Sequence, residues 1–209
     1  MSGEAQAFWD ERYRERGRAP LHEAHPYGRA ALASAVPGRA LELGCGLGAM
    51  AIWLASHGWT VTAVDVSRVA LDAAAEHAER AGVSSRITWQ HGDLREWTTQ
   101  ETFDLVAALF LHTPLELDAP ALLARAATQT RAGGTLLSVG HYTLPPSNPH
   151  STDGLLSARE VAVALGVQEP EWRVVVAEEL PRTQTGHDGR DTTVLDAVLH
   201  ALRLPGRLA

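Results

Sequence analysis

Short apolar runs alternate with amphipathic stretches through the middle of the chain. The runs "ALEL", "WTVTAVDV", "RITWQ", "FDLVAALF" and "GGTLLSVG" have the length and side-chain types of buried strands. Between them, apolar residues recur every three or four positions and predict helices over residues 49–57, 68–82 and 116–130. Ser67 stands where the N-cap of the second helix is expected. Strand alternating with helix indicates βαβ units and a parallel sheet.

The last part of the chain follows a different pattern. After a short predicted helix over residues 157–166, two strand-like segments, 171–180 and 191–202, have no room between them for a crossover helix. Neighbouring strands with a short connection must run antiparallel. The sequence therefore predicts an α/β fold with a doubly wound seven-stranded sheet, mostly parallel, in which the last strand is antiparallel.

The chain reads as a single domain over residues 1–209. We expect residues 1–36 to form an N-terminal helical cap or lid, built from an aromatic amphipathic helix over 4–16 and a second helix over 28–36. Residues 38–209 then form the core. The chain length suits one domain of this class.

Composition excludes several classes of protein. The net charge is −7 and all 18 basic residues are arginine, which argues against binding a nucleic-acid backbone. Without lysine, Schiff-base chemistry is excluded. The single cysteine, Cys45, rules out an internal disulfide and a cysteine-based zinc site. There is no apolar run of about 20 residues and no signal-like segment, so we expect a cytoplasmic protein without a membrane partner.

The stretch "LELGCGLG", residues 41–48, ends the first strand and precedes a helix. Ligands of doubly wound sheets bind at this edge, and glycine lets them approach the backbone closely. A tight turn without a ligand is one reading. A dinucleotide is another, because Gly44, Gly46 and Ala49 satisfy G-x-G-x-x-G/A and Asp65 follows Gly44 by 21 residues.

A third reading uses more of the chain. The segments "LELGCGLG", "VTAVDVS", "HGDLREW", "FDLVAALFLH" and "RAGGTLLSVGHY" follow one another between residues 38 and 142. This series resembles the motifs of class I S-adenosylmethionine-dependent methyltransferases. The segments "FWDERY" and "FLH" are most similar to the small-molecule branch that includes thiopurine and tellurite-resistance methyltransferases. The resemblance implies a Rossmann-like fold, S-adenosyl-L-methionine as cofactor and a small-molecule methyl acceptor.

The resemblance also implies which residues hold the cofactor. They lie on the N-terminal helix and at the carboxyl ends of the first four strands: Tyr13, Glu42, Gly44, Cys45, Gly46, Asp65, Val66, Asp93, Leu94, Ala108 and Leu109. The backbone of residues 44–46 would line the amino-acid tail. Asp65 would accept hydrogen bonds from the ribose hydroxyls, and Asp93 would accept one from the adenine amino group. We interpret Cys45 as a small loop residue and not as a nucleophile.

The substrate would meet the methyl group above the same edge of the sheet. His112 and His141 follow the fourth and fifth strands and are the candidate catalytic residues, since a neutral histidine can take a proton from a hydroxyl, amine or thiol. An already anionic nucleophile needs only proximity and desolvation, so a general base is not required by the chemistry. Candidate substrate-binding residues are Trp9, His25, Tyr27, Tyr142, Arg182 and His187.

Several alternatives stay open at this point. The candidate histidines may equally be loop residues bonded to the backbone. We expect no metal, because the separations of 29 and 46 residues between His112, His141 and His187 match no ligand motif. The rival functions are an NAD(P)-dependent oxidoreductase and a non-catalytic S-adenosylmethionine-binding protein. The sequence does not reveal the oligomeric state or the acceptor atom.

Overall fold

The computed structural model describes residues 2–15, 17, 21–111, 119–145, 155–185 and 189–206. The helices are α1 (Ser2–Glu15), α2 (Pro26–Leu32), α3 (Ala49–Ser56), α4 (Arg68–Arg80), the short 3-10 helix η1 (Ser84–Arg86), α5 (Ala119–Thr128) and α6 (Ala158–Ala164). The strands are β1 (Arg39–Leu43), β2 (Thr60–Asp65), β3 (Ile87–His91), β4 (Phe103–Leu109), β5 (Thr130–His141), β6 (Trp172–Thr185) and β7 (Asp191–Arg203).

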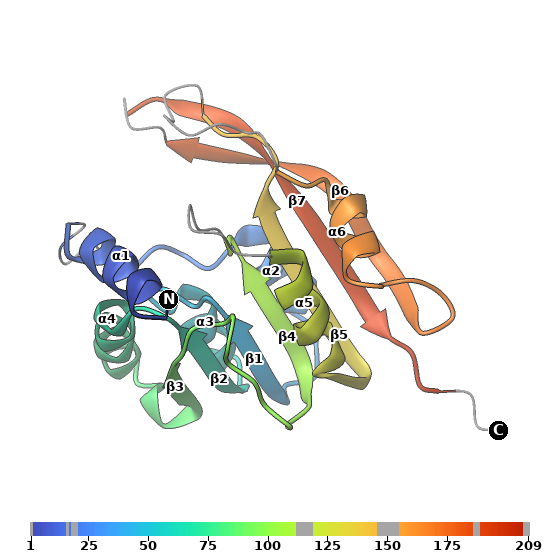
Figure 1. The fold of residues 1–209 in the computed structure, drawn as a ribbon, viewed down its shortest axis with the longest axis horizontal. Helices are drawn as coiled ribbons and strands as arrows, with labels where there is room; N and C mark the ends of the chain where they lie inside the picture. Colours follow the sequence, from blue (N-terminus) through green and yellow to red (C-terminus); the bar gives the residue numbers. More distant parts are fainter. Residues whose placement is uncertain are drawn as a thin grey trace.

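The strands form one seven-stranded sheet in the order β3-β2-β1-β4-β5-β7-β6 (Figure 1). β1 to β5 pair in parallel, and β7 runs antiparallel to both β5 and β6. The predicted fold class is therefore confirmed. The carboxyl ends of β1, β4 and β5 meet the start of β7 at one edge of the sheet.

The hairpin of β6 and β7 is longer than the sequence predicted. Its pairing begins at Trp172 opposite Arg203 and continues to Thr185 opposite Asp191, so it extends past the other strands (Figure 1). We expected the first strand of this pair to end near residue 180. Residues 181–185 pair with β7 and alternate in burial, so the strand continues through them instead. Arg182 consequently lies on a strand and not in a loop.

The second helix is also displaced from its expected bounds. The prediction was residues 28–36, and α2 instead covers Pro26–Leu32. Pro26 occupies the first turn, where its missing N–H costs nothing and its fixed φ suits the helix. His25 is therefore the N-cap residue of α2, directly beside the sheet edge.

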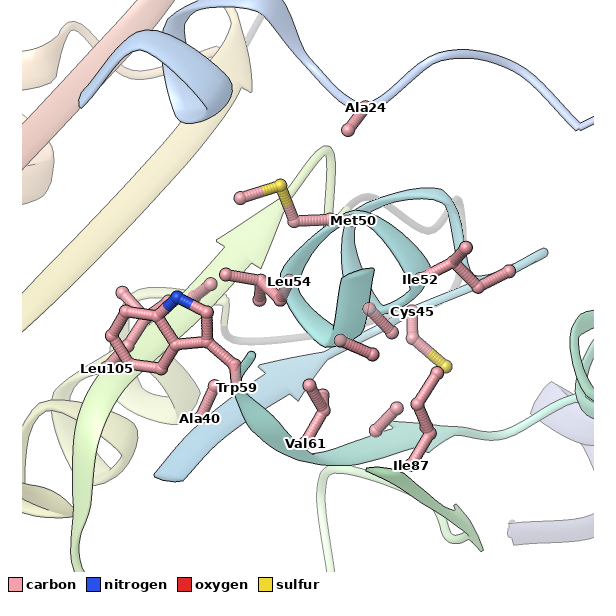
Figure 2. Close-up of a cluster of buried hydrophobic side chains, with 14 of the residues drawn as sticks. Ala24, Ala40, Cys45, Met50, Ile52, Leu54, Trp59, Val61, Ile87 and Leu105 are labelled. Atoms are coloured by element: carbon pink, nitrogen blue, oxygen red, sulfur yellow. The ribbon is translucent and has the colours of Figure 1, made fainter. Parts of the chain in front are cut away.

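Apolar layers cover both faces of the sheet. One layer joins the sheet to α2, α3 and α4 and includes Leu54, Trp59 and Val61, as Figure 2 shows. The opposite layer joins it to α5 and α6 and includes Phe103 and Trp172. Because apolar layers cover both faces of the sheet, polar side chains gather at the carboxyl ends of the strands. In the described ranges, no helix has both the length and the apolar character needed to cross a bilayer.

The N-terminal helix α1 is tied to the start of α4. The Ser67 hydroxyl donates to the Asp10 carboxylate at 2.7 Å, and the Val69 N–H donates to the same oxygen at 3.2 Å. The predicted N-cap at Ser67 is confirmed, since its hydroxyl oxygen accepts from the Ala70 N–H at 3.1 Å. Asp10 thus supplies a second acceptor to the α4 N-terminus and holds α1 at the carboxyl edge.

Candidate functional site

The loop of residues 44–48, called the glycine loop below, turns sharply between β1 and α3. Gly44 and Gly46 have φ values of 69° and 51°, which side chains rarely adopt. A Cβ at Gly44 would lie 2.6 Å from Cδ1 of Leu111, and one at Gly46 would lie 2.7 Å from the Tyr13 hydroxyl oxygen. Both conformation and close packing therefore demand glycine here.

Asp65, at the end of β2, connects the glycine loop to α4. One carboxylate oxygen accepts from the Gly46 N–H at 2.8 Å, and the other accepts from the Ser67 N–H at 2.9 Å. Burial raises the pKa of Asp65 above its usual value, although these backbone hydrogen bonds act against the rise. Each oxygen keeps a second lone pair, which a ribose hydroxyl can use.

Glu42 is the most unusual group near the loop. Its side chain is on β1, the residue is 4% exposed, and among the described residues its Oε2 atom has no hydrogen-bond partner. Burial raises the pKa of Glu42 to about 8; a hydrogen bond from the Ala51 backbone opposes this rise, and the charge of Asp65 adds to it. A buried carboxyl oxygen without a partner is costly, and a ligand ammonium would satisfy it. The loop therefore fits a cofactor with an amino-acid tail.

Asp93 already has a charged partner. The Arg95 guanidinium donates to both of its oxygens, with Nη2 to Oδ2 at 2.5 Å. These hydrogen bonds hold the pKa of Asp93 below its usual value. The sequence analysis missed Arg95, although the spacing D-x-R within "GDLR" was available. An adenine amino group at Asp93 would share the carboxylate with Arg95.

The other predicted cofactor residues gather at the same edge. Ala108 pairs with Leu43 on β1, and Leu109 ends β4. Val66 and Leu94 follow β2 and β3. Cys45 points into the apolar layer near Ile87 (Figure 2), and burial raises the pKa of its thiol well above the usual value. A thiol so hard to ionise is a packing residue and not a nucleophile.

The aromatic side of α1 faces the glycine loop. The Tyr13 hydroxyl lies against Gly46, as the close approach above shows, and the ring of Trp9 lies 6.0 Å from that of Tyr13. Both predicted residues are therefore brought to the cofactor edge. Arg12 covers the Trp9 ring at 5.9 Å.

A second set of residues gathers at the same edge and is called the Asp196 cluster below. It consists of His25, Phe110, His141, Arg182 and Asp196. The Asp196 residue on β7 is 1% exposed. His25 Nε2 lies 3.0 Å from one of its oxygens, and His141 Nδ1 lies 3.7 Å from the other. Arg182 reaches both oxygens, with Nε at 2.5 Å and Nη2 at 3.1 Å.

Asp196 is ionised in this environment. Burial acts to raise the pKa of its carboxyl, but the nearby His141, hydrogen bonds from His25 and Arg182, and the charge of Arg182 together hold it far below its usual range. A buried carboxylate with a bidentate arginine is a fixed anion. The cluster therefore presents its two histidines to a permanent negative charge.

Aromatic rings line one side of the Asp196 cluster. Phe110 stacks on His141 with ring centroids 4.5 Å apart, meets His25 edge-on at 5.5 Å, and lies 5.3 Å under the Arg182 guanidinium. Its φ of 54° is a conformation seldom adopted by a bulky residue. Phe110 and Asp196 were both missed from sequence. The acid inside the apolar run "VLDAVL" was the available signal for Asp196.

The remaining predicted substrate residues lie elsewhere. Tyr27 packs against His200, with its hydroxyl 3.4 Å from Nδ1, and so lies farther along β7 than Asp196. Tyr142 is exposed, just beyond β5. His112 and His187 fall outside the described residues. In the described ranges, no group of three or more His, Cys, Asp or Glu residues is arranged to hold a metal ion.

Comparison with known proteins finds a similarity over the first strands of the sheet. Residues 40–134 match a family model described as a methyltransferase domain. This part of the chain, just under half of its length, is similar to a methyltransferase domain. The matched residues of this methyltransferase domain run from β1 into β5, so they include the glycine loop, Asp65, Asp93 and the end of β4.

The chain is also similar to curated methyltransferases over about half of its length. Ribosomal RNA small subunit methyltransferase C of Alcanivorax borkumensis is 35% identical over 112 residues, which cover 52% of this chain and 34% of that protein. Ubiquinone biosynthesis O-methyltransferase of Coxiella burnetii is 33% identical over 99 residues, covering 46% of this chain and 40% of that protein. The chain thus matches about a third to two fifths of the length of these relatives.

The fold extends the similarity to almost the whole chain. The structure of magnesium protoporphyrin IX methyltransferase from Synechocystis PCC 6803, with bound S-adenosylhomocysteine, superposes with a TM-score of 0.68 at 16% identity. That superposition covers 97% of this chain and 100% of the other. At this identity the likeness establishes the Rossmann-like methyltransferase fold.

Proposed function

We propose that this protein transfers a methyl group from S-adenosyl-L-methionine to a small-molecule acceptor. The observation that carries the proposal is the pairing of the glycine loop with the unpartnered Oε2 atom of Glu42. The cofactor has an ammonium to satisfy that oxygen, and it has no pyrophosphate for the loop to neutralise. A dinucleotide would bring a pyrophosphate and no ammonium to the loop, so the buried Oε2 atom of Glu42 would stay without a partner.

The proposal assigns the parts of the cofactor to separate strand ends. Glu42 and the backbone of residues 44–46 hold the amino-acid tail, Asp65 holds the ribose, and Asp93 with the Leu94 N–H holds the adenine. When bound, the cofactor supplies an electrophilic methyl group on a sulfonium centre. The backbone at Ala108 and Leu109 lies beside that tail, because Ala108 pairs with the last residue of β1.

We infer that α1 is a lid over this cofactor. Its Tyr13 hydroxyl approaches the glycine loop, and its Asp10 carboxylate binds the N-terminus of α4. A ligand on the loop must displace the Tyr13 hydroxyl or accept a hydrogen bond from it. Since Asp10 accepts two hydrogen bonds from the start of α4, release of these contacts would loosen α1 and help to open the edge to the cofactor.

The acceptor is proposed to be a small molecule in the cytoplasm. The net charge of −7 and the absence of lysine disfavour a nucleic-acid backbone. The relative named as a ribosomal RNA methyltransferase makes RNA the competing acceptor, but the match covers only 34% of it. The Asp196 cluster supports a small-molecule acceptor. Its charged groups lie in the protein beside aromatic rings and do not form an open basic surface.

Isothermal titration calorimetry tests the cofactor. The protein is titrated with S-adenosylhomocysteine, NAD and NADP. Micromolar binding of S-adenosylhomocysteine alone is the expected result. Binding of NAD or NADP in its place would overturn the proposal and favour an oxidoreductase. Product formation from radiolabelled S-adenosylmethionine with thiol, phenol, amine and RNA acceptors then separates an enzyme from a non-catalytic binding protein and a small-molecule acceptor from RNA.

A further inference from the structure

One nitrogen of His25 is buried without a hydrogen-bond partner. The His25 side chain is 7% exposed, its Nε2 atom lies 3.0 Å from Asp196, and among the described residues its Nδ1 atom has no partner. An ionised carboxylate only accepts hydrogen bonds, so the Nε2 atom carries the hydrogen and donates it. In the neutral ring, Nδ1 is then an acceptor with an unused lone pair.

Arg182 fixes the state of this pair. Its two donors hold Asp196 in one orientation and keep it ionised. An ionised Asp196 fixes the tautomer of His25 and would stabilise the imidazolium formed when Nδ1 takes up a proton. A histidine arranged in this way is suited to act as a general base.

The Asp196 cluster lies along the edge that holds the glycine loop. His141 is opposite Asp196 in the pairing of β5 with β7, and Phe110 directly follows β4, which pairs with β1. Neighbouring strands are spaced about 4.8 Å apart, so β5 lies about 10 Å from β1. This separation leaves room for a methyl donor on the glycine loop and an acceptor against the cluster.

The rings of the Asp196 cluster indicate the shape of that acceptor. Phe110 and His141 form a stack, with an interplanar angle of 30°, and His25 meets Phe110 at 66°. A group of aromatic rings around a buried proton acceptor suits an acceptor that is itself aromatic and bears a protonated nucleophile. A phenolic hydroxyl, with a pKa near 10, is such a nucleophile and needs help to lose its proton at neutral pH.

We propose that His25 is the catalytic proton acceptor for methyl transfer to a phenolic hydroxyl, and that Asp196 is its positioning residue. The inference rests on the proposed methyltransferase function and narrows its substrate class. The hydroxyl proton passes to His25 Nδ1 while the oxygen lone pair forms the new bond to the methyl carbon. The electron pair of the broken carbon–sulfur bond stays on sulfur, which leaves neutral S-adenosylhomocysteine and a methyl ether.

The test compares two phenols of different acidity in a matched pair of variants. His25→Gln keeps an amide N–H that can donate to Asp196 but removes the base. His22→Gln is the control, because His22 is an exposed histidine three residues earlier in the same segment. Catechol needs a base, whereas 4-nitrocatechol is largely ionised at pH 8 and does not. kcat/KM for methylation of each phenol is measured by mass spectrometry.

The expected result is selective. His25→Gln lowers kcat/KM for catechol at least about 100-fold, the usual size of a general-base contribution, and for 4-nitrocatechol less than about tenfold. His22→Gln changes neither by more than about twofold. In His25→Ala, added imidazole restores part of the catechol activity, which checks the role if the glutamine variant folds poorly.

Other outcomes overturn the inference in distinguishable ways. Equal losses for both phenols in His25→Gln would mean a structural role for His25. A wild-type protein that binds S-adenosylhomocysteine and methylates thiols or amines but neither phenol would refute the phenol assignment and leave the proposed function intact. Failure of the wild-type protein to bind S-adenosylhomocysteine would refute both.

Discussion

The Nε2 atom of His25 lies 3.0 Å from Oδ2 of Asp196, although 171 positions separate the two residues in the sequence. His25 precedes α2 in the N-terminal region, and Asp196 lies inside the last described strand. Their contact joins the predicted N-terminal cap to the predicted core within the Asp196 cluster. Four predictions follow from this cluster and from the groups around the glycine loop.

Asp196→Asn should destabilise the protein by about 3 kcal/mol at pH 7, because the half-buried Arg182 guanidinium loses its buried counter-charge. The folded-state pKa of Asp196 is lowered, so its contribution is present above the ordinary carboxyl pKa and is lost as pH falls toward the folded value. The difference in free energy of unfolding between variant and wild type should therefore shrink below about pH 4. Urea denaturation at pH 7 and pH 3.5 measures both.

The control for Asp196→Asn is Asp191→Asn. Asp191 begins the same strand, is exposed, and accepts a hydrogen bond only from Thr185 among the described contacts, at 2.8 Å. It should change stability by less than about 0.5 kcal/mol, as surface substitutions do. Similar losses of stability in the two variants would contradict the interpretation that the buried Asp196 carboxylate stabilises the fold.

Glu42→Gln should change how stability depends on pH. The pKa of Glu42 is raised to about 8 in the folded protein, so the stabilising contribution of its protonated form is complete below the unfolded-state pKa and is lost as pH rises through about 8. Glutamine does not titrate. The variant should gain stability relative to wild type between pH 5 and pH 8, by up to about 1.4 kcal/mol per pH unit.

Thermal and urea unfolding of the cofactor-free protein at pH 5, 7 and 8.5 measure this gain. Glu101→Gln is the control, because Glu101 is exposed and pairs with Arg39 at the surface. A stability difference between Glu42→Gln and wild type that stays constant over this pH range would show that Glu42 titrates normally. Glu42→Gln should also bind S-adenosylhomocysteine more weakly, since glutamine cannot lose a proton to give the ligand ammonium an anionic acceptor.

Asp10→Ala should release α1 from α4. The Ser67 hydroxyl and the Val69 N–H lose their shared acceptor, and loss of a cap costs about 1 kcal/mol. Amide hydrogen exchange should accelerate in residues 2–15 while exchange in β1 and β4 stays unchanged. Glu11→Ala, at an exposed neighbouring position that pairs with Arg14, should leave exchange as in wild type. Unaltered exchange in Asp10→Ala would show that other contacts hold the helix.

Asp65→Ala should weaken binding of S-adenosylhomocysteine by more than 1 kcal/mol, the scale of a lost charged hydrogen bond, or more than about fivefold in Kd. Asp72→Ala, on the exposed side of α4, controls for the change in net charge. Calorimetry measures both variants. An affinity equal to that of wild type in Asp65→Ala would remove Asp65 from the cofactor site.

Local pattern was enough to predict most of the fold. The alternation of apolar runs and amphipathic stretches predicted the parallel strands, and the short connection before residue 191 predicted the reversed strand. Ser67 was recognisable because capping depends on neighbouring residues alone. The end of β6 was wrong because pairing with β7 extends residues 181–185 as a strand, and such pairing is not visible in either segment by itself.

The substrate side was less predictable than the cofactor edge. His141 and Arg182 were chosen because they lie near strand ends, and His25 was chosen as a lid residue. Their meeting point, Asp196, was interpreted only as part of a strand. Its role arises from the register that places it opposite His141, together with Arg182 from the neighbouring strand. Phe110 was likewise counted as the end of an apolar run. Contacts that depend on pairing between distant strands cannot be recognised from the spacing of residues within one segment.

The position of β7 between β5 and β6 has a consequence for the order in which the protein matures on the ribosome. β6 pairs only with β7 in the described sheet, so it has no partner until β7 has been made. The strands that carry the glycine loop, Asp65 and Ala108 are complete about eighty residues earlier. During synthesis the glycine loop, Asp65 and the end of β4 are therefore present before the Asp196 anion, and the Asp196 cluster is completed last.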